Sequence, residues 1–156
     1  MYNTMRKIVI GCDNAAVDLK NEIIKQLETL GVEVENVGCD SVEDQTYYPL
    51  IAEKVCNKII ESRYEKRGIL ICGTGIGMAM TANKFKGIRA AACHDIFSTE
   101  RSILSNNANV MCMGERVIGK EVAKRLVREW IELEFVDGSS TPKVKAIQNI
   151  ESTTMK

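Results

Sequence analysis

The feature that most constrains the fold is an alternation of two hydrophobic patterns. From Lys7 onward, short runs rich in β-branched residues alternate with longer stretches in which apolar residues recur every three or four positions. The first pattern is typical of buried strands and the second of amphipathic helices, so their alternation predicts parallel βαβ units. Residues 1–156 are therefore expected to form a single α/β domain with a Rossmann-like, doubly wound parallel sheet of about five strands.

The same pattern locates the individual elements. Strands are expected at residues 7–11, 32–37, 68–72, 88–92 and 109–113, and helices at residues 16–30, 49–60, 76–85, 95–106 and 119–134. The last of these helices is expected to turn Val122, Leu126, Val127 and Trp130 inward, because they recur at helical spacing.

The C-terminal segment does not belong to this alternation. After a polar break at residues 137–140, residues 143–150 predict a short helix that has no obvious place in the core. Segment 139–156 is therefore expected to pack on a partner subunit.

Composition excludes several classes of function. With 45% hydrophobic and 27% charged residues, the chain matches globular proteins, and its 21 basic residues balance 21 acidic ones. No excess positive field is available for nucleic acid or an anionic membrane, and no apolar run is long enough to span a bilayer. The six cysteines are scattered without a C-x-x-C pair and there is one histidine, which favours a reduced, cytoplasmic protein without structural metal.

Three loops follow the carboxyl ends of expected strands, where ligands bind in open parallel sheets. They are residues 11–14, residues 72–77 and residues 93–95. The middle loop places three alternating glycines between a strand and a helix, so successive backbone N–H groups can converge on one anion. It is neither a phosphate-binding Walker loop nor a dinucleotide loop, and Met78 stands where a cysteine phosphatase needs arginine.

Cys72 begins this loop just ahead of a helix, where N–H donors and the helix dipole are expected to stabilise a thiolate. A thiolate can remove a proton beside a carbonyl while the amides hold the oxyanion that forms. This arrangement predicts enolisation chemistry without a cofactor.

Simpler interpretations of the same residues remain open at this point. Cys72 can be one more buried thiol, and Asp13 or Asn14 a helix cap. His94 can be an ordinary loop histidine, and Arg116 a lone surface arginine.

Six motifs in order resemble the ribose-5-phosphate isomerase B family, which includes the galactose-6-phosphate isomerase subunits. They are residues 11–13, 70–77, 82–84, 87–90, 106–110 and 114–119. The resemblance extends from about Arg6 to Glu151. It implies a metal-free cis-enediol mechanism that interconverts an aldose and a ketose phosphate, and a homodimer or dimer of dimers with active sites at the subunit interface.

The resemblance also implies roles for individual residues. Cys72 matches the catalytic base, Thr74 a residue that assists proton transfer at the oxygens, and Asp13 a ligand of a substrate hydroxyl. Asn106 and Arg116 match residues that the second subunit supplies, the arginine as a phosphate contact. The anion hole matches the backbone of Gly73, Gly75, Ile76 and Gly77.

Departures from the family pattern concern the phosphate and the sugar ring. Asn14 replaces a histidine that helps to bind phosphate, and Lys143 stands at a position where arginine is usual. Ser105 replaces the histidine that opens the sugar ring. Either the substrate needs no ring opening, as a four-carbon sugar phosphate would not, or His94 has assumed that role.

Two hypotheses of other classes remain beside the isomerase. The altered phosphate ligands favour a non-catalytic sugar-phosphate binder or one subunit of a heteromeric isomerase, whereas the intact Cys72 loop favours an enzyme. A redox role for Cys72 is the weakest, because no resolving cysteine lies near it in sequence.

Overall fold

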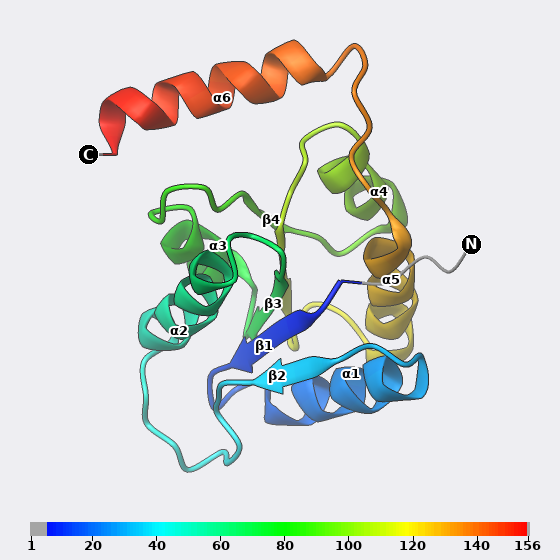
Figure 1. Cartoon of the computed structure of the whole chain (residues 1–156). Coiled ribbons are helices and arrows are strands. Elements are labelled where there is room, and N and C mark those ends of the chain that lie inside the picture. Colours follow the sequence, from blue (N-terminus) through cyan, green and yellow to red (C-terminus); the bar gives the residue numbers. More distant parts are fainter. Residues whose placement is uncertain (1–5, 156) are drawn as a thin grey trace.

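A computed structural model describes residues 6–155 and shows one parallel sheet with helices on both faces (Figure 1). The strands are β1 (Ile8–Cys12), β2 (Val34–Asn36), β3 (Arg67–Cys72), β4 (Ala90–Ala92) and β5 (Val110–Gly114). Every pairing is parallel, in the order β2-β1-β3-β5-β4. The predicted Rossmann-like, single-domain fold with five strands is confirmed; residues 1–5 and 156 of the expected domain lie outside the described residues.

The helices form two layers around this sheet and one outlying arm. They are α1 (Val17–Thr29), α2 (Tyr48–Glu61), α3 (Ile76–Ala82), α4 (Ile96–Leu104), α5 (Lys120–Glu132) and α6 (Thr141–Thr154). α2 and α3 pack together on one face, and α5 packs with α1 and α4 on the other (Figure 1). α6 lies apart from both layers, across one end of the molecule (Figure 1).

The pairing register aligns the ends of four strands. Cys72 is opposite Gly114 in the β3–β5 ladder. Extending the neighbouring ladders by one or two residues puts Asp13 beside Cys72 and His94 beside Gly114. Residues paired across adjacent strands project to the same face of a sheet, so these four positions form one row on the α2/α3 side.

Element ends differ from the sequence prediction where tertiary contacts intervene. β2 and β4 cover three residues each rather than the predicted 32–37 and 88–92, because an edge strand has a ladder on one side only. α3 ends at Ala82 rather than residue 85: the Asn83 amide both donates to the Ala90 carbonyl (2.9 Å) and accepts from its N–H (2.8 Å). This exchange ties the chain to β4 instead of continuing the helix.

The predicted inward face of α5 is correct except at one position. Leu126, Val127 and Trp130 are buried, but Val122 is 52% exposed. Ala123 takes its place in the core. At 100° per residue, Ala123 is in line with the buried stripe and Val122 falls beyond its edge.

α6 is longer than the predicted helix at residues 143–150, and it barely touches the rest of the chain. Val144 is its one buried residue among residues 141–154, while Ile147 and Ile150 are 45% and 64% exposed. The Glu151 carboxylate accepts from the Gly87 N–H at 2.6 Å, and a cavity of about 640 Å³ separates α6 from β4 and α4. The packing of segment 139–156 on a partner subunit therefore stays a prediction. Residue 156, the last of this segment, lies outside the described part of the chain.

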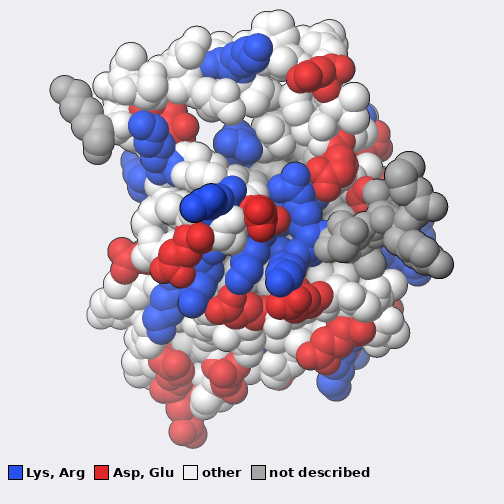
Figure 2. Space-filling model, viewed as in Figure 1, with Lys and Arg blue, Asp and Glu red and all other residues white. Residues whose placement is uncertain are grey.

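The face of the molecule seen in Figure 2 has no large patch of charges of one sign. Figure 2 shows basic and acidic side chains intermixed, as the balanced composition predicts. Within residues 6–155, no helix combines the length and apolar character that crossing a bilayer requires.

The α5 assignment is testable with two substitutions on one helix. Leu126→Ala removes a side chain that is 2% exposed and should lower the free energy of unfolding by about 2–5 kcal/mol. Val122→Ala, at the exposed position, should change it by less than about 0.5 kcal/mol. Urea denaturation at a fixed protein concentration measures both values; equal losses would contradict the assigned inner face.

Candidate active site

The Cys72 sulfur sits within the glycine loop that follows β3. The Gly75 N–H donates to Cys72 Sγ at 3.1 Å, and the thiol is 5% exposed. The Ile76 N–H donates to the Thr74 hydroxyl oxygen at 3.3 Å. Among residues 6–155 the amides of Gly73, Thr74 and Gly77 donate to no protein acceptor, so three amide donors of the loop are available to a ligand.

Close backbone crossings hold this loop in place. A Cβ on Gly114 would lie 2.4 Å from Thr74 Cα, and a Cβ on Gly75 would lie 2.8 Å from the Met113 carbonyl carbon. Gly75 also has a φ of +80°, which glycine adopts without strain. The loop therefore passes directly over the end of β5, and glycine is required at both contacts, Gly75 in the loop and Gly114 in β5.

Two side chains from other elements line the loop. The Arg116 guanidinium lies against Gly73, because a Cβ built there would be 3.4 Å from Arg116 Nη1. The Tyr48 ring, from the start of α2, covers Gly77, where a Cβ would be 2.5 Å from two ring carbons. The resemblance assigns Arg116 to the second subunit, whereas the structure places it over Gly73 of the same chain.

Asp13 and Asn14 do not cap α1, contrary to the simpler interpretation. The helix starts after Ala16 with no side-chain cap, and Asp13 Oδ1 instead accepts from the Ala15 N–H at 3.0 Å. Asp13 Oδ2 has no recorded partner in residues 6–155. The turn thus presents one carboxylate oxygen beside the end of β3, with Asn14 half-buried next to it.

His94 accepts a hydrogen bond from the backbone. The Gly114 N–H donates to His94 Nε2 at 2.9 Å, so the imidazole is neutral and carries its proton on Nδ1. Burial lowers the pKa of this histidine, and the neighbouring Asp95 opposes the shift only in part. Asp95 itself caps α4 by accepting from the Ser98 N–H at 2.7 Å.

Two predicted site residues lie away from Cys72. α4 begins where β4 ends and runs back along the sheet, so Asn106, just beyond its last turn, is at the amino end of the strands. Asn106 lines the cavity beneath α6, and Lys143 is exposed in the first turn of α6. One chain therefore gathers Asp13, Cys72 and Arg116, but not these two residues.

The other cysteines behave as structural thiols. Burial raises the pKa of Cys12 and Cys56 to about 12 and that of Cys39 to about 11, and it also raises the pKa of Cys93 and Cys112. They stay neutral at pH 7. In the described residues, 6–155, no group of three His, Cys, Asp or Glu residues could hold a metal ion.

Sequence reasoning missed Tyr48 as a neighbour of the loop and Lys20 as a buried cation. Lys20 is 0% exposed although α1 has a solvent-facing side. A signal was present: Lys20 occurs at helical spacing from Ala16 and Ile23, within the apolar stripe of the helix.

Comparisons with known proteins show the family of this chain. A profile described as Ribose/Galactose Isomerase matches residues 8–147. The chain belongs to this family. It is 49% identical over 144 residues to "D-erythrulose-4-phosphate isomerase 2" of Mycolicibacterium smegmatis, with 90% of this chain and 94% of that protein covered. It is 46% identical to "D-erythrulose-4-phosphate isomerase" of Pectobacterium atrosepticum, with 92% and 93% covered.

A solved structure extends the likeness to three dimensions. Ribose-5-phosphate isomerase B of Mycoplasma genitalium, crystallised with bound ribulose-5-phosphate, superposes with a TM-score of 0.90 at 30% identity, covering 95% of this chain and 97% of that one. The resemblance to the ribose-5-phosphate isomerase B family is thus confirmed, and the chain is an aldose–ketose isomerase of sugar phosphates.

The crossing of the loop over β5 is testable in this isomerase. Gly114→Ala forces Thr74 and Gly73 away from β5 and should lower kcat/KM by about 100-fold or more, because a displacement near 1 Å is enough for such a loss. Gly119→Ala is the control, since a Cβ there meets nothing within 4 Å. Steady-state isomerase assays on folded variants measure both; a fully active Gly114→Ala enzyme would contradict the account.

Proposed function

We propose that this isomerase interconverts D-erythrulose 4-phosphate and the corresponding four-carbon aldose phosphate, with Cys72 as the base. The observation that carries the choice of substrate is the hydrogen bond that occupies His94 Nε2. The names of the relatives from Mycolicibacterium smegmatis and Pectobacterium atrosepticum point to the same substrate.

A four-carbon sugar phosphate needs no ring opening. Closing a furanose on an aldose requires a free hydroxyl on C4, and in these compounds the C4 oxygen carries the phosphate. The substrate therefore arrives with its carbonyl exposed. A pentose such as ribose 5-phosphate has a free C4 hydroxyl and is mostly cyclic, so its isomerase must first open the ring.

His94 is not suited to that opening step. The lone pair of His94 is engaged by the Gly114 amide, and Nδ1 carries a proton, so the neutral ring can donate a hydrogen bond but cannot accept a proton. The lowered pKa of His94 also disfavours an imidazolium that would act as an acid. Ser105 offers no titratable group in place of the family's histidine.

The proposed reaction moves one proton between two carbons. Cys72 thiolate takes a proton from C1 of the ketose, and the electron pair forms the C1–C2 double bond of an enediol as O2 takes up a proton. The sulfur then returns a proton to C2 while O1 loses its own, which gives the aldose with no net change in oxidation state. The amides of Thr74 and Gly77 are proposed to hold the oxygen on which charge develops, and the Thr74 hydroxyl is proposed to relay protons between O1 and O2.

Substrate binding is divided among the remaining residues. Asp13 is proposed to accept from a substrate hydroxyl, and Arg116 to bind the phosphate as a bidentate donor. Asn14 and His94 are proposed to donate further hydrogen bonds to the substrate. The amides of Gly75 and Ile76 are already committed within the loop, so they shape the anion hole rather than contact the ligand.

The partner subunit is proposed to supply Asn106 and Lys143, as in a homodimer or dimer of dimers with shared sites. Both residues lie away from Cys72 in their own chain. α6 extends away from the two helix layers, and its apolar side chains Ile147 and Ile150 are exposed. Exposed apolar side chains also flank the β4 edge, where a second copy would cover them. They are Ile76 and Met80 on α3, and Ile96 and Phe97 on α4.

The substrate proposal predicts a difference in how rates depend on enzyme concentration. With D-erythrulose 4-phosphate the initial rate should stay proportional to enzyme throughout. With ribose 5-phosphate it should level off once spontaneous ring opening becomes limiting, and kcat/KM should be at least about 10-fold lower. A rate on ribose 5-phosphate that rises with enzyme as steeply as the tetrose rate would contradict the proposal; Ser105→His should remove the plateau.

Shared sites predict rescue between two inactive variants. Cys72→Ala and Asn106→Ala should each be inactive as homodimers, since every site lacks one of the two groups. After subunit exchange, about half of the dimers are mixed and one of their two sites is intact, so roughly a quarter of wild-type activity should return. Assays before and after exchange measure this recovery; persistent inactivity of the mixture would refute sites built from two chains.

A further inference from the structure

Lys20 is a fully buried lysine that no step of the proposed reaction uses. It projects from α1 toward the chain segment that follows β2, and its side chain is 0% exposed. A buried ammonium is costly unless it is paired and hydrogen-bonded, so the groups around it are expected to be specific.

Three acceptors surround the Lys20 ammonium, and all of them come from residues 36–40. Nζ donates to the Cys39 carbonyl at 2.6 Å, to Asn36 Oδ1 at 3.3 Å and to the Asp40 carboxylate. Asn36 also donates to Asp40 at 2.7 Å. The three donors of the ammonium are thus fully used, and the pKa of Asp40 is lowered chiefly by its hydrogen bond to Lys20.

The segment bound by Lys20 also holds the end of β1. The Cys12 N–H donates to the Gly38 carbonyl at 2.7 Å, and the Cys39 N–H donates to the Cys12 carbonyl at 2.5 Å. The Cys12 thiol donates to the Cys39 carbonyl, the same oxygen that Lys20 binds. Cys12 immediately precedes Asp13, whose own N–H makes only a long contact of 3.3 Å to β3.

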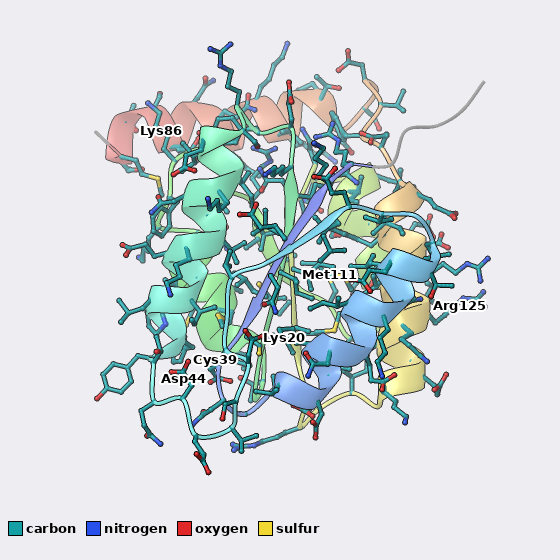
Figure 3. All side chains as sticks on the ribbon, turned by 60° about the horizontal axis from the view of Figure 1, so that its bottom comes forward. Lys20, Cys39, Asp44, Lys86, Met111 and Arg125 are labelled. Carbon is teal, nitrogen blue, oxygen red and sulfur yellow. The ribbon has the colours of Figure 1, made fainter. Side chains whose placement is uncertain are left out.

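The loop beyond this point borders the site. Burial raises the pKa of Cys39 to about 11, and the neighbouring carboxylates of Asp44 and Asp13 raise it as well. Figure 3 shows Lys20, Cys39 and Asp44 close together near the end of β1. The same loop leads to Tyr48, which covers Gly77.

We propose that Lys20 is a positioning residue, which fixes residues 36–40 against Cys12 and thereby sets the place of Asp13 and of the loop that walls the substrate site. Cys72 and its glycine loop are held from the other side, by β5 and Gly114. Removing the ammonium therefore disturbs substrate binding more than proton transfer. This inference rests on the proposed isomerase function, in which Asp13 binds a substrate hydroxyl.

The test compares two lysines of α1. Lys20→Met keeps an unbranched side chain, one atom shorter, but removes the three donors, and it should raise KM for D-erythrulose 4-phosphate roughly 10-fold while kcat stays within about 3-fold. Lys25→Met, at an exposed position of the same helix, should change neither value. Asp40→Asn keeps an acceptor without the charge and should raise KM by a smaller factor.

Hydrogen exchange of the free proteins gives a second readout that needs no substrate. Amides of residues 36–46 should exchange faster in Lys20→Met than in Lys25→Met, while those of residues 67–77 keep their protection. If Lys20→Met does not fold, Asp40→Asn, whose side chain is 75% exposed, decides the question by the same two readouts.

The outcomes separate the two proposals. A folded Lys20→Met enzyme with the KM and exchange rates of Lys25→Met would overturn the role of Lys20. A roughly 10-fold loss in kcat with an unchanged KM would overturn it as well. A wild-type protein inactive on every four- and five-carbon sugar phosphate would instead overturn the proposed function. The exchange pattern would still test whether Lys20 fixes residues 36–40.

Discussion

The structure depends on the crossing of one glycine loop over the end of one strand. Gly114 in β5 has no side chain, and the Thr74 backbone occupies the space where a side chain would stand. At this crossing the Gly75 amide donates to the Cys72 sulfur, and the Gly114 amide donates to His94 Nε2. The proposed base, its amide donors and the neutral histidine are therefore set by the same backbone geometry.

Register explains why residues distant in sequence meet at this point. Asp13, Cys72, Gly114 and His94 each stand at the end of a parallel strand, and the ladders bring them to one level on one face. A chain with the same strands shifted by one residue would turn these side chains to the opposite face. The site is thus a consequence of strand pairing, and the helices mainly supply its walls.

Much of this arrangement was predictable from the sequence, because strand ends and glycine spacing are local features. The pattern of residues 68–77 was enough to predict the strand, the turn and the position of Cys72. Contacts between layers were not predictable: the burial of Lys20 depends on acceptors 16 to 20 residues away, and the protonation of His94 depends on a backbone amide of β5. The separation of Asn106 from Cys72 likewise follows from the direction of α4, which local patterns do not describe.

The claim that Cys72 is the proton-transferring base is tested most directly by isotope exchange. The enzyme is incubated with D-erythrulose 4-phosphate in D₂O, and deuterium at C1 of the ketose and C2 of the aldose is followed by NMR. Wild type should incorporate deuterium, and Cys72→Ala should lose incorporation and isomerisation together, by on the order of 10²- to 10⁴-fold. Exchange that persists at the wild-type rate in Cys72→Ala would contradict the account.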